Sequence, residues 1–302
     1  MSNSLLVLEK DVIKPEKPTF MIAGFNQFAN VGNVSSGIPE YLIEKLHARK
    51  VVNIRKGDFY IFQVPGSPFN LRPRVDYVEG CEKYYLEEPI NDFYYAEISE
   101  KGLIIFNGTE PNQREDVYVH TLLDGAEEMR VKRIIVPASI GGEVPFDKER
   151  LVNCHYNLKQ MQEELNNYAF TFPTYNINAT IGMVINHFSK ERGIESVRMR
   201  AFTPSYQFSV MIQDDKRAMY DILRRIRYMF GISLDLSDLE KESEQQISDY
   251  SDALNKLFTD RPDLKPQIAA YMEQIRERYE ELKFEEPVKI PDVFMKEFDN
   301  HL

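Results

Sequence analysis

The sequence lacks the features that mark several common classes of protein. It has no tryptophan and only two cysteines, Cys81 and Cys154, which are too few for a disulfide framework and show no Cys-x-x-Cys or Cys/His ligand spacing. No stretch approaches the roughly 18 uninterrupted apolar residues of a membrane span. The range 1–17 has no basic region followed by a long apolar stretch. We therefore expect a cytoplasmic protein that is not associated with a membrane.

Complete catalytic and ligand-binding motifs are also missing. The chain has neither the Gly-Lys-Ser/Thr of a phosphate loop nor the GxGxxG of a dinucleotide fold, and its five histidines show no metal-ligand spacing. Cys154 and His155 are neighbours, so on a strand they would point to opposite faces and could not act as nucleophile and base. We predict no metal, no cofactor and no catalytic residue, and a protein-binding role rather than an enzymatic one.

A basic field is absent as well. The net charge is −11, and most of it belongs to the range 236–302, which holds 17 acidic and 9 basic residues. The rest of the chain is nearly neutral. Nucleic acids are therefore excluded as partners, because their binding depends on clustered Lys and Arg.

What is present indicates an ordinary folded protein. Hydrophobic residues make up 43% and charged residues 28% of the chain, so a sizeable core can form. Runs rich in β-branched residues, each followed by a Gly, Pro or Asn cluster, predict buried strands at Phe20–Phe25, Leu103–Asn107, Arg133–Ala138 and Val197–Phe202. Helical periods lie between them. This alternation predicts an α/β fold with an open, mostly parallel sheet and right-handed crossovers.

One of the predicted helices has clear ends. Asp214 and Asp215 precede an apolar stripe at helical spacing, and Gly231 follows it, which is an acidic start and a glycine stop. A second face of the same helix is basic, with Arg217, Arg224, Arg225 and Arg227. Such a face is most often solvated, and the alternative is that it docks an acidic segment.

Three other segments differ from the α/β pattern. The range 51–97 has short aromatic strands interrupted by prolines and is predicted to be an edge β-hairpin insertion in a domain of residues 1–235. Apolar residues at a period of about 3.5 predict an α-helical hairpin at 236–284. The remaining range, 285–302, is predicted to be an irregular tail.

Ligands of open parallel sheets bind beyond the carboxyl ends of the strands. Four loops are expected to converge there: Asn26–Asn33, Gly108–Gln113, Ser139–Pro145 and Thr203–Tyr206. The candidate ligand-binding residues of this crevice are Asn26, Asn30, Gly32, Asn33, Ser35, Glu110, Asn112, Gly141, Glu143 and Tyr206. The stretch Gly32–Gly37 could hold a phosphate or carboxylate, or could simply form a turn and a helix cap.

The predicted hairpin carries more aromatic surface than one helix seam consumes. Tyr250, Phe258, Tyr271 and Tyr279 are therefore candidates for an interaction surface, either with the sheet domain or with another subunit.

The sequence resembles the proteasome assembly chaperone 2 family through a series of short motifs in a fixed order. They are Gly24-Phe25-Asn26 and Gly32-Asn33, Asp58-Phe59-Tyr60, Arg72-Pro73, Pro89 with Phe93-Tyr94, Gly108-Thr109-Glu110-Pro111, the passage 130–141, Arg192-Gly193-Ile194, Phe202-Thr203-Pro204-Ser205-Tyr206 and the stretch 234–240. The resemblance spans about residues 20–284. It implies a three-layer α/β/α fold similar to nucleoside phosphorylases, self-association into a homo-oligomer, and a non-catalytic role in assembling or engaging proteasomes.

This chain departs from the family pattern at three places. Asn30 stands where the family often has Asp, Asn178-Ala179-Thr180 stands where it often has glycines, and the range 299–302 lacks the hydrophobic-Tyr-any ending by which some members insert into proteasome pockets. The partners implied are a second copy of the chain, proteasome subunits or another protein. The alternatives are a homo-oligomeric scaffold of another role, or a small-molecule enzyme that uses the strand-end crevice.

Overall fold

The computed structural model describes residues 5–8, 15, 19–61, 74–85, 89–206 and 213–279. Their strands form one eight-stranded sheet and one two-stranded sheet. In chain order the strands are β1 (Leu6–Leu8), β2 (Thr19–Asn26), β3 (Arg49–Ile54), β4 (Arg74–Val78), β5 (Cys81–Tyr85), β6 (Asn91–Ile98), β7 (Lys101–Thr109), β8 (Val131–Gly142), β9 (Val152–Tyr156) and β10 (Glu195–Pro204).

The large sheet has the strand order β1-β3-β6-β7-β2-β8-β10-β9. Its centre, β7-β2-β8-β10, is parallel, and β6 and β9 flank this centre in the antiparallel direction. Counting β3, which is antiparallel to β6, five of the eight strands run the same way. The prediction of a mostly parallel sheet is confirmed, and the four strands predicted from apolar runs are β2, β7, β8 and β10.

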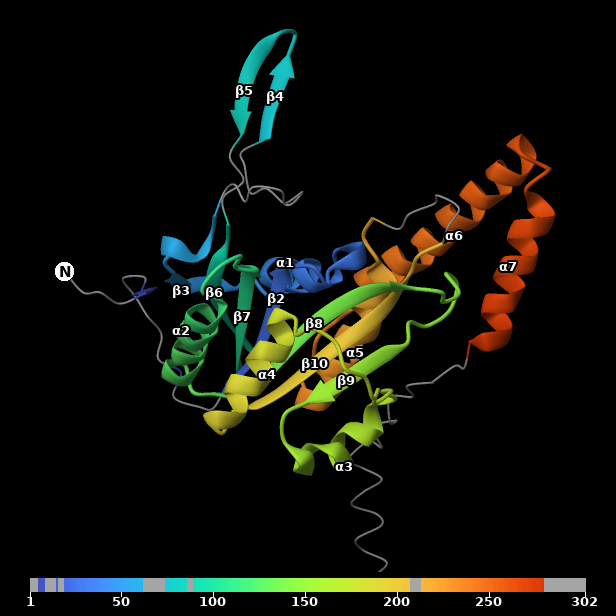
Figure 1. Cartoon of the computed structure of the whole chain (residues 1–302). Helices are drawn as coiled ribbons and strands as arrows, with labels where there is room; N and C mark the ends of the chain where they lie inside the picture. The colour runs from blue at the N-terminus through green and yellow to red at the C-terminus, as the bar shows by residue number, and fades with distance from the viewer. Residues whose placement is uncertain are drawn as a thin grey trace, which may run out of the picture.

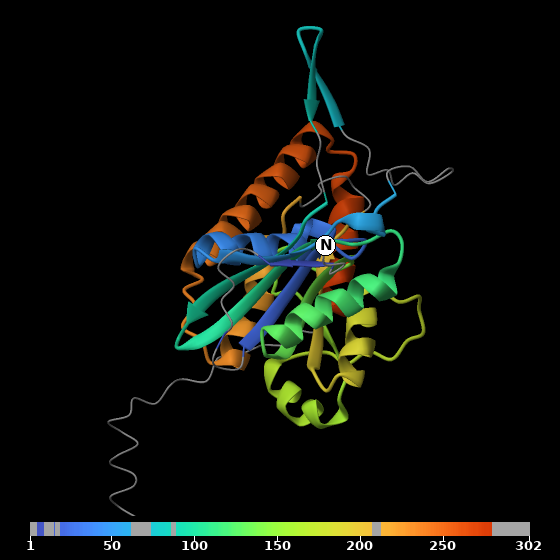
Figure 2. The same ribbon diagram turned by 90° about the vertical axis from the view of Figure 1, so that its left-hand side faces the viewer.

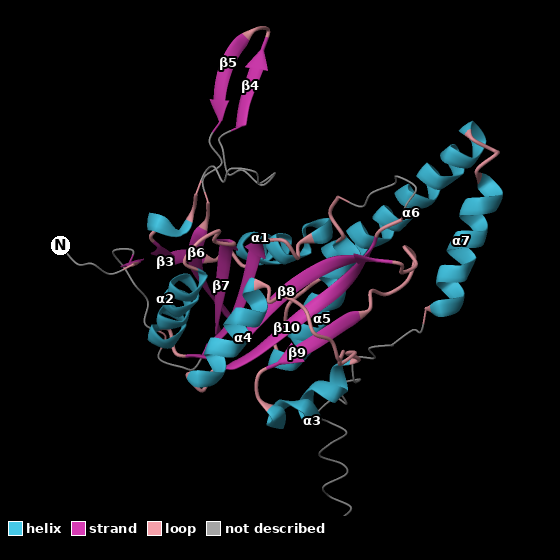
Figure 3. Cartoon of the chain, in the orientation of Figure 1, coloured by secondary structure: helices cyan, strands magenta, loops and turns pink. Residues whose placement is uncertain are grey.

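Helices cover both faces of this sheet (Figures 1 and 3). They are α1 (Val34–Lys45), α2 (Glu115–Glu128), α3 (Gln162–Leu165), α4 (Ile181–Glu191), α5 (Lys216–Phe230), α6 (Ser237–Asp260) and α7 (Lys265–Arg278). One core cluster joins the sheet to α1 and α5, and a second joins the other face to α2 and α4. Helices α2 and α4 lie side by side (Figure 2). The arrangement is a three-layer α/β/α fold.

Strand β2 shows why the sequence of a central strand is a continuous apolar run. Ile22 points into the α1/α5 cluster, whereas Met21 and Ala23 point into the α2/α4 cluster, and all three are fully buried. A strand covered by helices on both faces has no solvated side, so the polar alternation of a half-exposed strand is missing.

Helix α5 begins and ends where the sequence predicts. The carboxylate of Asp215 accepts a hydrogen bond from the amide of Ala218 (3.0 Å), which caps the first turn. Gly231 closes the helix in the left-handed conformation, at φ 55°. Both signals are local in sequence, so the sequence was sufficient to place them.

The range 51–97, predicted to be an edge insertion, divides into two parts. Strands β3 and β6 belong to the large sheet, where β6 pairs with β7. Only β4 and β5 form the separate two-stranded antiparallel sheet. Prolines at the ends of the aromatic stretches made all of these strands look peripheral. Strand β6 nevertheless forms a tight hairpin with β7, and the long-range pairing of β7 with β2 places both beside the parallel centre.

The two helices expected after residue 236 both form, as α6 and α7. Leu236 and Leu239 are buried in the α1/α5 cluster, which anchors the start of α6 on the body of the protein. Close pairing of α6 with α7 as a hairpin and the likeness to nucleoside phosphorylases stay predictions, as do the domain boundaries. The predicted tail at 285–302 lies outside the described residues. Within the described part of the chain, the helices are all too short or too polar to cross a membrane.

Candidate functional site

Loops that follow the parallel strands meet at one edge of the sheet. The amide of Glu110, after β7, donates to the carbonyl of Asn26 at the end of β2 (3.0 Å). The amide of Asp215, which follows β10 in the chain, donates to the carbonyl of Gly32 in the connection from β2 to α1 (2.8 Å). This edge is where the crevice was expected.

The connection from β2 to α1 uses its polar groups internally. Asn30 accepts a hydrogen bond from the amide of Ser36 at its side-chain oxygen and donates to the hydroxyl of Ser36 (3.0 Å each). The hydroxyl of Ser35 is fully buried, donates to the carbonyl of Pro137 (2.8 Å) and accepts from the amide of Phe25 (3.2 Å). These contacts are those of a turn and a helix start.

Gly32 is required in this connection for two reasons. Its φ of 65° lies in the left-handed region, which favours glycine. In addition, a Cβ atom at this position would lie 2.9 Å from the Cβ of Asp215. The role that the structure shows for Gly32 is thus close packing of the connection against the start of α5.

Beside the connection opens a hollow of about 850 Å³. Three of the candidate residues, Asn26, Asn30 and Asn33, line it together with part of α1. Its charged lining residues are Glu40, Glu44, Asp214, Glu242 and Lys216. Burial, and secondarily the charge of Asp214, raises the pKa of Glu40 above its ordinary value. Four carboxyl groups against one ammonium group make this hollow suited to a basic group and unsuited to an anion.

Glu110 and Asn112 connect neighbouring segments of the chain through side-chain hydrogen bonds. The Glu110 carboxylate accepts from the amide of Phe28 (3.0 Å) and from the amide of Ile181 at the start of α4 (3.4 Å). Asn112 accepts from the amide of Ile61 (2.7 Å) and donates to its carbonyl (2.9 Å). Neither residue lines the hollow.

Gly141, Glu143 and Tyr206 form a separate group near α7. Glu143 accepts a hydrogen bond from the hydroxyl of Tyr271 (2.6 Å), and Tyr206 donates to the carbonyl of Val144 (2.6 Å). A Cβ at Gly141 would lie 2.9 Å from the Cβ of Ser205, so this position packs two strand ends together. Glu110 and Glu143 therefore contact different elements, and the structure does not bring the ten candidate residues into one cluster.

The four aromatic residues proposed for an interaction surface pack within the chain. Tyr250 is 5% exposed, and its ring lies 4.5 Å from the ring of Phe146. Tyr271 contacts Glu143, and Tyr279 donates to the carbonyl of Glu149 (2.5 Å). Phe258 packs against the same small cluster as Tyr250. The segment from α6 to α7 thus docks on the body through the loop between β8 and β9, and a further role in binding a partner stays a prediction.

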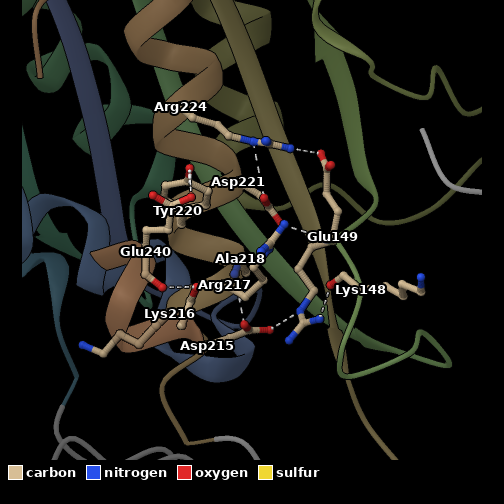
Figure 4. Close-up of polar contacts among 12 residues, drawn as sticks. Lys148, Glu149, Asp215, Lys216, Arg217, Ala218, Tyr220, Asp221, Arg224 and Glu240 are labelled. Carbon is tan, nitrogen blue, oxygen red and sulfur yellow. Dashed lines mark hydrogen bonds and ion pairs between the residues drawn. The ribbon is translucent and has the colours of Figure 1, made fainter. Parts of the chain in front are cut away.

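A buried network of charges holds that loop on α5 (Figure 4). Arg150 and Asp215 form an ion pair of 2.9 Å with side chains 1% and 0% exposed. The fully buried Asp221 accepts from the amide of Arg150 (2.7 Å) and pairs with Arg217 (3.1 Å). Burial raises the pKa of Asp221, against the opposing effect of Arg217 and Arg224.

This network corrects the reading of the basic face of α5 as solvated. Arg225 is 1% exposed and donates to Glu149 (2.7 Å) and to the carbonyl of Tyr168 (2.9 Å). Arg224 also pairs with Glu149. The partners lie far away in sequence, so the local charge pattern carried no sign of them.

Three exposed apolar residues have their main chains anchored at the strand-end edge, a feature that the sequence reasoning missed. Phe28 is 80% exposed, Ile61 39% and Ile90 41%. All three are anchored on one stretch, residues 109–112: Phe28 through Glu110, Ile61 through Asn112, and Ile90 through two hydrogen bonds with Thr109 (2.7 and 3.0 Å). We call Phe28, Ile61 and Ile90 the 109–112 patch. Ile90 also lines the acidic hollow.

Comparisons with known proteins identify similar chains. A family model described as the PAC2 family matches residues 24–252. A PAC2 family protein from Streptomyces avermitilis is similar in structure, with a TM-score of 0.66 and 18% identity, over 80% of this chain and 98% of that one. A search of curated proteins by sequence found no match.

Two further structures carry functional descriptions of their own. A proteasome-assembly chaperone homologue from Mycobacterium tuberculosis has a TM-score of 0.66 and 18% identity, over 78% of this chain and 94% of that one. An archaeal proteasome activator from Pyrococcus furiosus has a TM-score of 0.59 and 17% identity, over 83% of this chain and 97% of that one. At these identities the likeness concerns the fold.

Proposed function

The chain belongs to the PAC2 family, and from this premise we propose that it is a non-catalytic protein-binding factor that assembles or engages proteasomes. The proposed partners are a proteasome component and a second copy of the chain. The proposed place of action is the cytoplasm, where free thiols such as the buried Cys154 persist. Similar structures described as a proteasome-assembly chaperone homologue and a proteasome activator support this proposal.

The observation that carries the proposal is the 109–112 patch. A phenylalanine that is 80% exposed loses contact with water only when something covers it. The other two residues of the patch come from two other segments of the chain, yet the main chains of all three are fixed by hydrogen bonds to residues 109–112. A rigidly held apolar group of this kind is typical of a protein-binding surface.

The charge beside the patch indicates what the partner presents. The acidic hollow shares Ile90 and Thr109 with the patch. A partner surface with an apolar centre and a neighbouring Lys or Arg would match both features, because opposite charges at the rim speed and orient association.

Variants of Phe28 test the proposal. The change Phe28→Asp should weaken binding to purified proteasome core particle from the same organism by about tenfold or more, the size expected for an apolar anchor. The matched control is Val78→Asp, which places the same charge at an apolar side chain that is 58% exposed elsewhere in the chain. Biolayer interferometry gives both dissociation constants, and sedimentation velocity reports self-association of the same variants. The proposal would be contradicted if the wild type and both variants had the same dissociation constant for the core particle and the same degree of self-association.

A further inference from the structure

Strand β10 buries two arginines beneath helix α4. Arg198 is 1% exposed and Arg200 is 7% exposed. In the antiparallel pairing with β9, Arg198 stands opposite His155 and Arg200 stands opposite Asn153. Directly opposite residues share a face of the sheet, so these four side chains form one polar group on the face that α4 covers.

Neither guanidinium has a carboxylate partner among the described residues. The other deeply buried arginines do have one: Arg150 pairs with Asp215, and Arg225 with Glu149. By contrast, Nε and Nη1 of Arg198 and Nε of Arg200 are buried without a hydrogen-bond acceptor within that part of the chain. Buried charges in proteins are normally paired, because their removal from water must be compensated. Tyr175 hydrogen-bonds the Arg198 side chain but carries no formal charge. Two neighbouring guanidinium groups without a carboxylate partner in the described part of the chain therefore indicate a missing anion.

The start of α4 adds positive potential at the same place. A Cβ atom on Gly182, in the first turn, would lie 3.0 Å from Cδ and 3.2 Å from Nε of Arg198, so this side chain runs directly against the helix backbone. The hydroxyl of Thr180, at the N-cap, is buried and also lacks a partner among the described residues. The N-terminus of an 11-residue helix attracts anions through its dipole. The amide of Ile181 already donates to the Glu110 carboxylate (3.4 Å), and the amides of Met183 and Val184 donate to the carbonyl of Thr180. The donors that remain here for a second anion are the guanidinium groups and the Thr180 hydroxyl.

Tyr175 covers the two guanidinium groups from the solvent side. Its ring centroid lies 5.0 Å from Cζ of Arg200, and its hydroxyl contacts Nε2 of His155. The side chain is 38% exposed, and its neighbours in the range 174–179 are exposed as well. The segment 172–180 has neither helix nor strand. Movement of this segment alone would open the arginines to a small solute.

We propose that Arg198, Arg200 and the N-terminus of α4 form a binding site for the oxyanion group, carboxylate or phosphate, of a small molecule. The guanidinium groups donate paired hydrogen bonds to its oxygens, and the Thr180 hydroxyl completes its coordination. This site lies on the α2/α4 face of the sheet, whereas the acidic hollow lies beside α1. It is thus separate from the hollow, and its role is additional to the proposed protein binding.

A single fluorophore can report on the site, because the chain contains no tryptophan. In the variant Tyr175→Trp, titration with inorganic phosphate or with acetate should change the emission in a saturable way, and sodium chloride at equal ionic strength should not. Comparison of phosphate with acetate distinguishes a tetrahedral from a planar ligand group. The control Tyr228→Trp places the fluorophore at a tyrosine of similar exposure, 39%, on α5, and should show no saturable change.

Substitution of the arginines tests the assignment with an independent measurement. Arg198→Met, and separately Arg200→Gln, should reduce the oxyanion-dependent rise in melting temperature to the level seen with chloride, which corresponds to a loss of affinity of about tenfold or more. Neither variant should melt below the wild type in the absence of oxyanion, because an unpaired buried charge has been removed. The control Arg192→Met changes an arginine at the other end of α4 that pairs with Asp124 and Glu127, and should keep the response. If the wild type responds to oxyanions no more than to chloride, or if both arginine variants respond like the wild type, the proposal is wrong.

Discussion

Single polar residues at the strand-end edge have structural roles that their residue type does not reveal. Ser35 looked like a hydroxyl free to bind an anion, but it is buried and bonded to two backbone groups. Glu110 looked like a candidate acid, but it holds the amide of Phe28 and that of Ile181. A side chain in a loop can donate or accept at many partners, so only the fold decides which one it finds.

His155 illustrates how neighbours set the chemistry of one residue. Burial, and then the charges of Arg198 and Arg200, lowers the pKa of His155 to about 4. In the unfolded chain the same group has a pKa of about 6.5. Between these two values the unfolded state binds more protons than the folded state, so the free energy of unfolding falls as the pH falls through this window.

The expected result is a steeper acid loss of stability in the wild type than in His155→Gln. Urea unfolding at several pH values between 7 and 4 measures this difference. The control is His187→Gln, which changes a histidine whose side chain is 68% exposed. It should leave the dependence of the free energy of unfolding on pH as in the wild type. Parallel slopes for the wild type and His155→Gln would show that His155 does not carry this pH dependence.

At the scale of elements, the loop between β8 and β9 depends on its ion pairs with α5. Arg150 and Asp215 are almost fully buried, so removal of one partner leaves a charge in the interior. Arg150→Met is expected to lower the free energy of unfolding by about 3 to 5 kcal/mol. Adding Asp215→Asn should restore part of the loss, because asparagine still caps α5 and the stranded charge is gone.

Urea unfolding of the two single variants and the double variant measures the coupling. The matched control is Arg261→Gln, which breaks the exposed pair between Arg261 and Asp263 and should cause no measurable loss. If Arg150→Met is as stable as the wild type, or if Arg150→Met with Asp215→Asn simply adds the two losses, the network does not stabilise the loop as described.

The elements that could be predicted from sequence are those specified by local signals. The apolar runs of β2, β7, β8 and β10 and the caps of α5 are read from a few adjacent residues. The position of β6 in the sheet could not be predicted in this way, because it depends on its hairpin partner β7 pairing with the distant strand β2. The stretch Val197–Phe202 was predicted to be a buried strand, and β10 is buried, but the sequence did not indicate that α4 covers a face carrying Arg198 and Arg200.

The candidate site was predicted less completely than the fold. Asn26, Asn30 and Asn33, which the sequence assigned to one crevice, line one hollow, and binding of a ligand there stays a prediction. The ion pairs of α5 and the 109–112 patch could not be predicted, since each joins segments that lie far apart in sequence. The signal that was available for the patch is a bulky aromatic residue, Phe28, in a loop that has three asparagines and one glutamine.

For the whole molecule, the arrangement of layers leaves two exposed features, the strand-end edge of the sheet and the pair of helices α6 and α7. The strand-end edge presents the 109–112 patch beside an acidic hollow. Helices α6 and α7 follow α5 in the chain and project from the body of the protein (Figure 1). Hydrogen bonds to the loop between β8 and β9 fix them to that body. A rigid body with an exposed apolar anchor is suited to docking on another folded surface.

The most direct measurement is photo-crosslinking from the patch in cells of the source organism. A photoreactive benzoylphenylalanine is placed at position 28 in one strain and at position 78 in another, and the adducts are identified by mass spectrometry. We expect a discrete adduct from position 28 with a proteasome component or with a second copy of the chain, and none from position 78. No adduct from position 28, or the same adducts from both positions, would contradict the claim that this edge is the protein-binding surface.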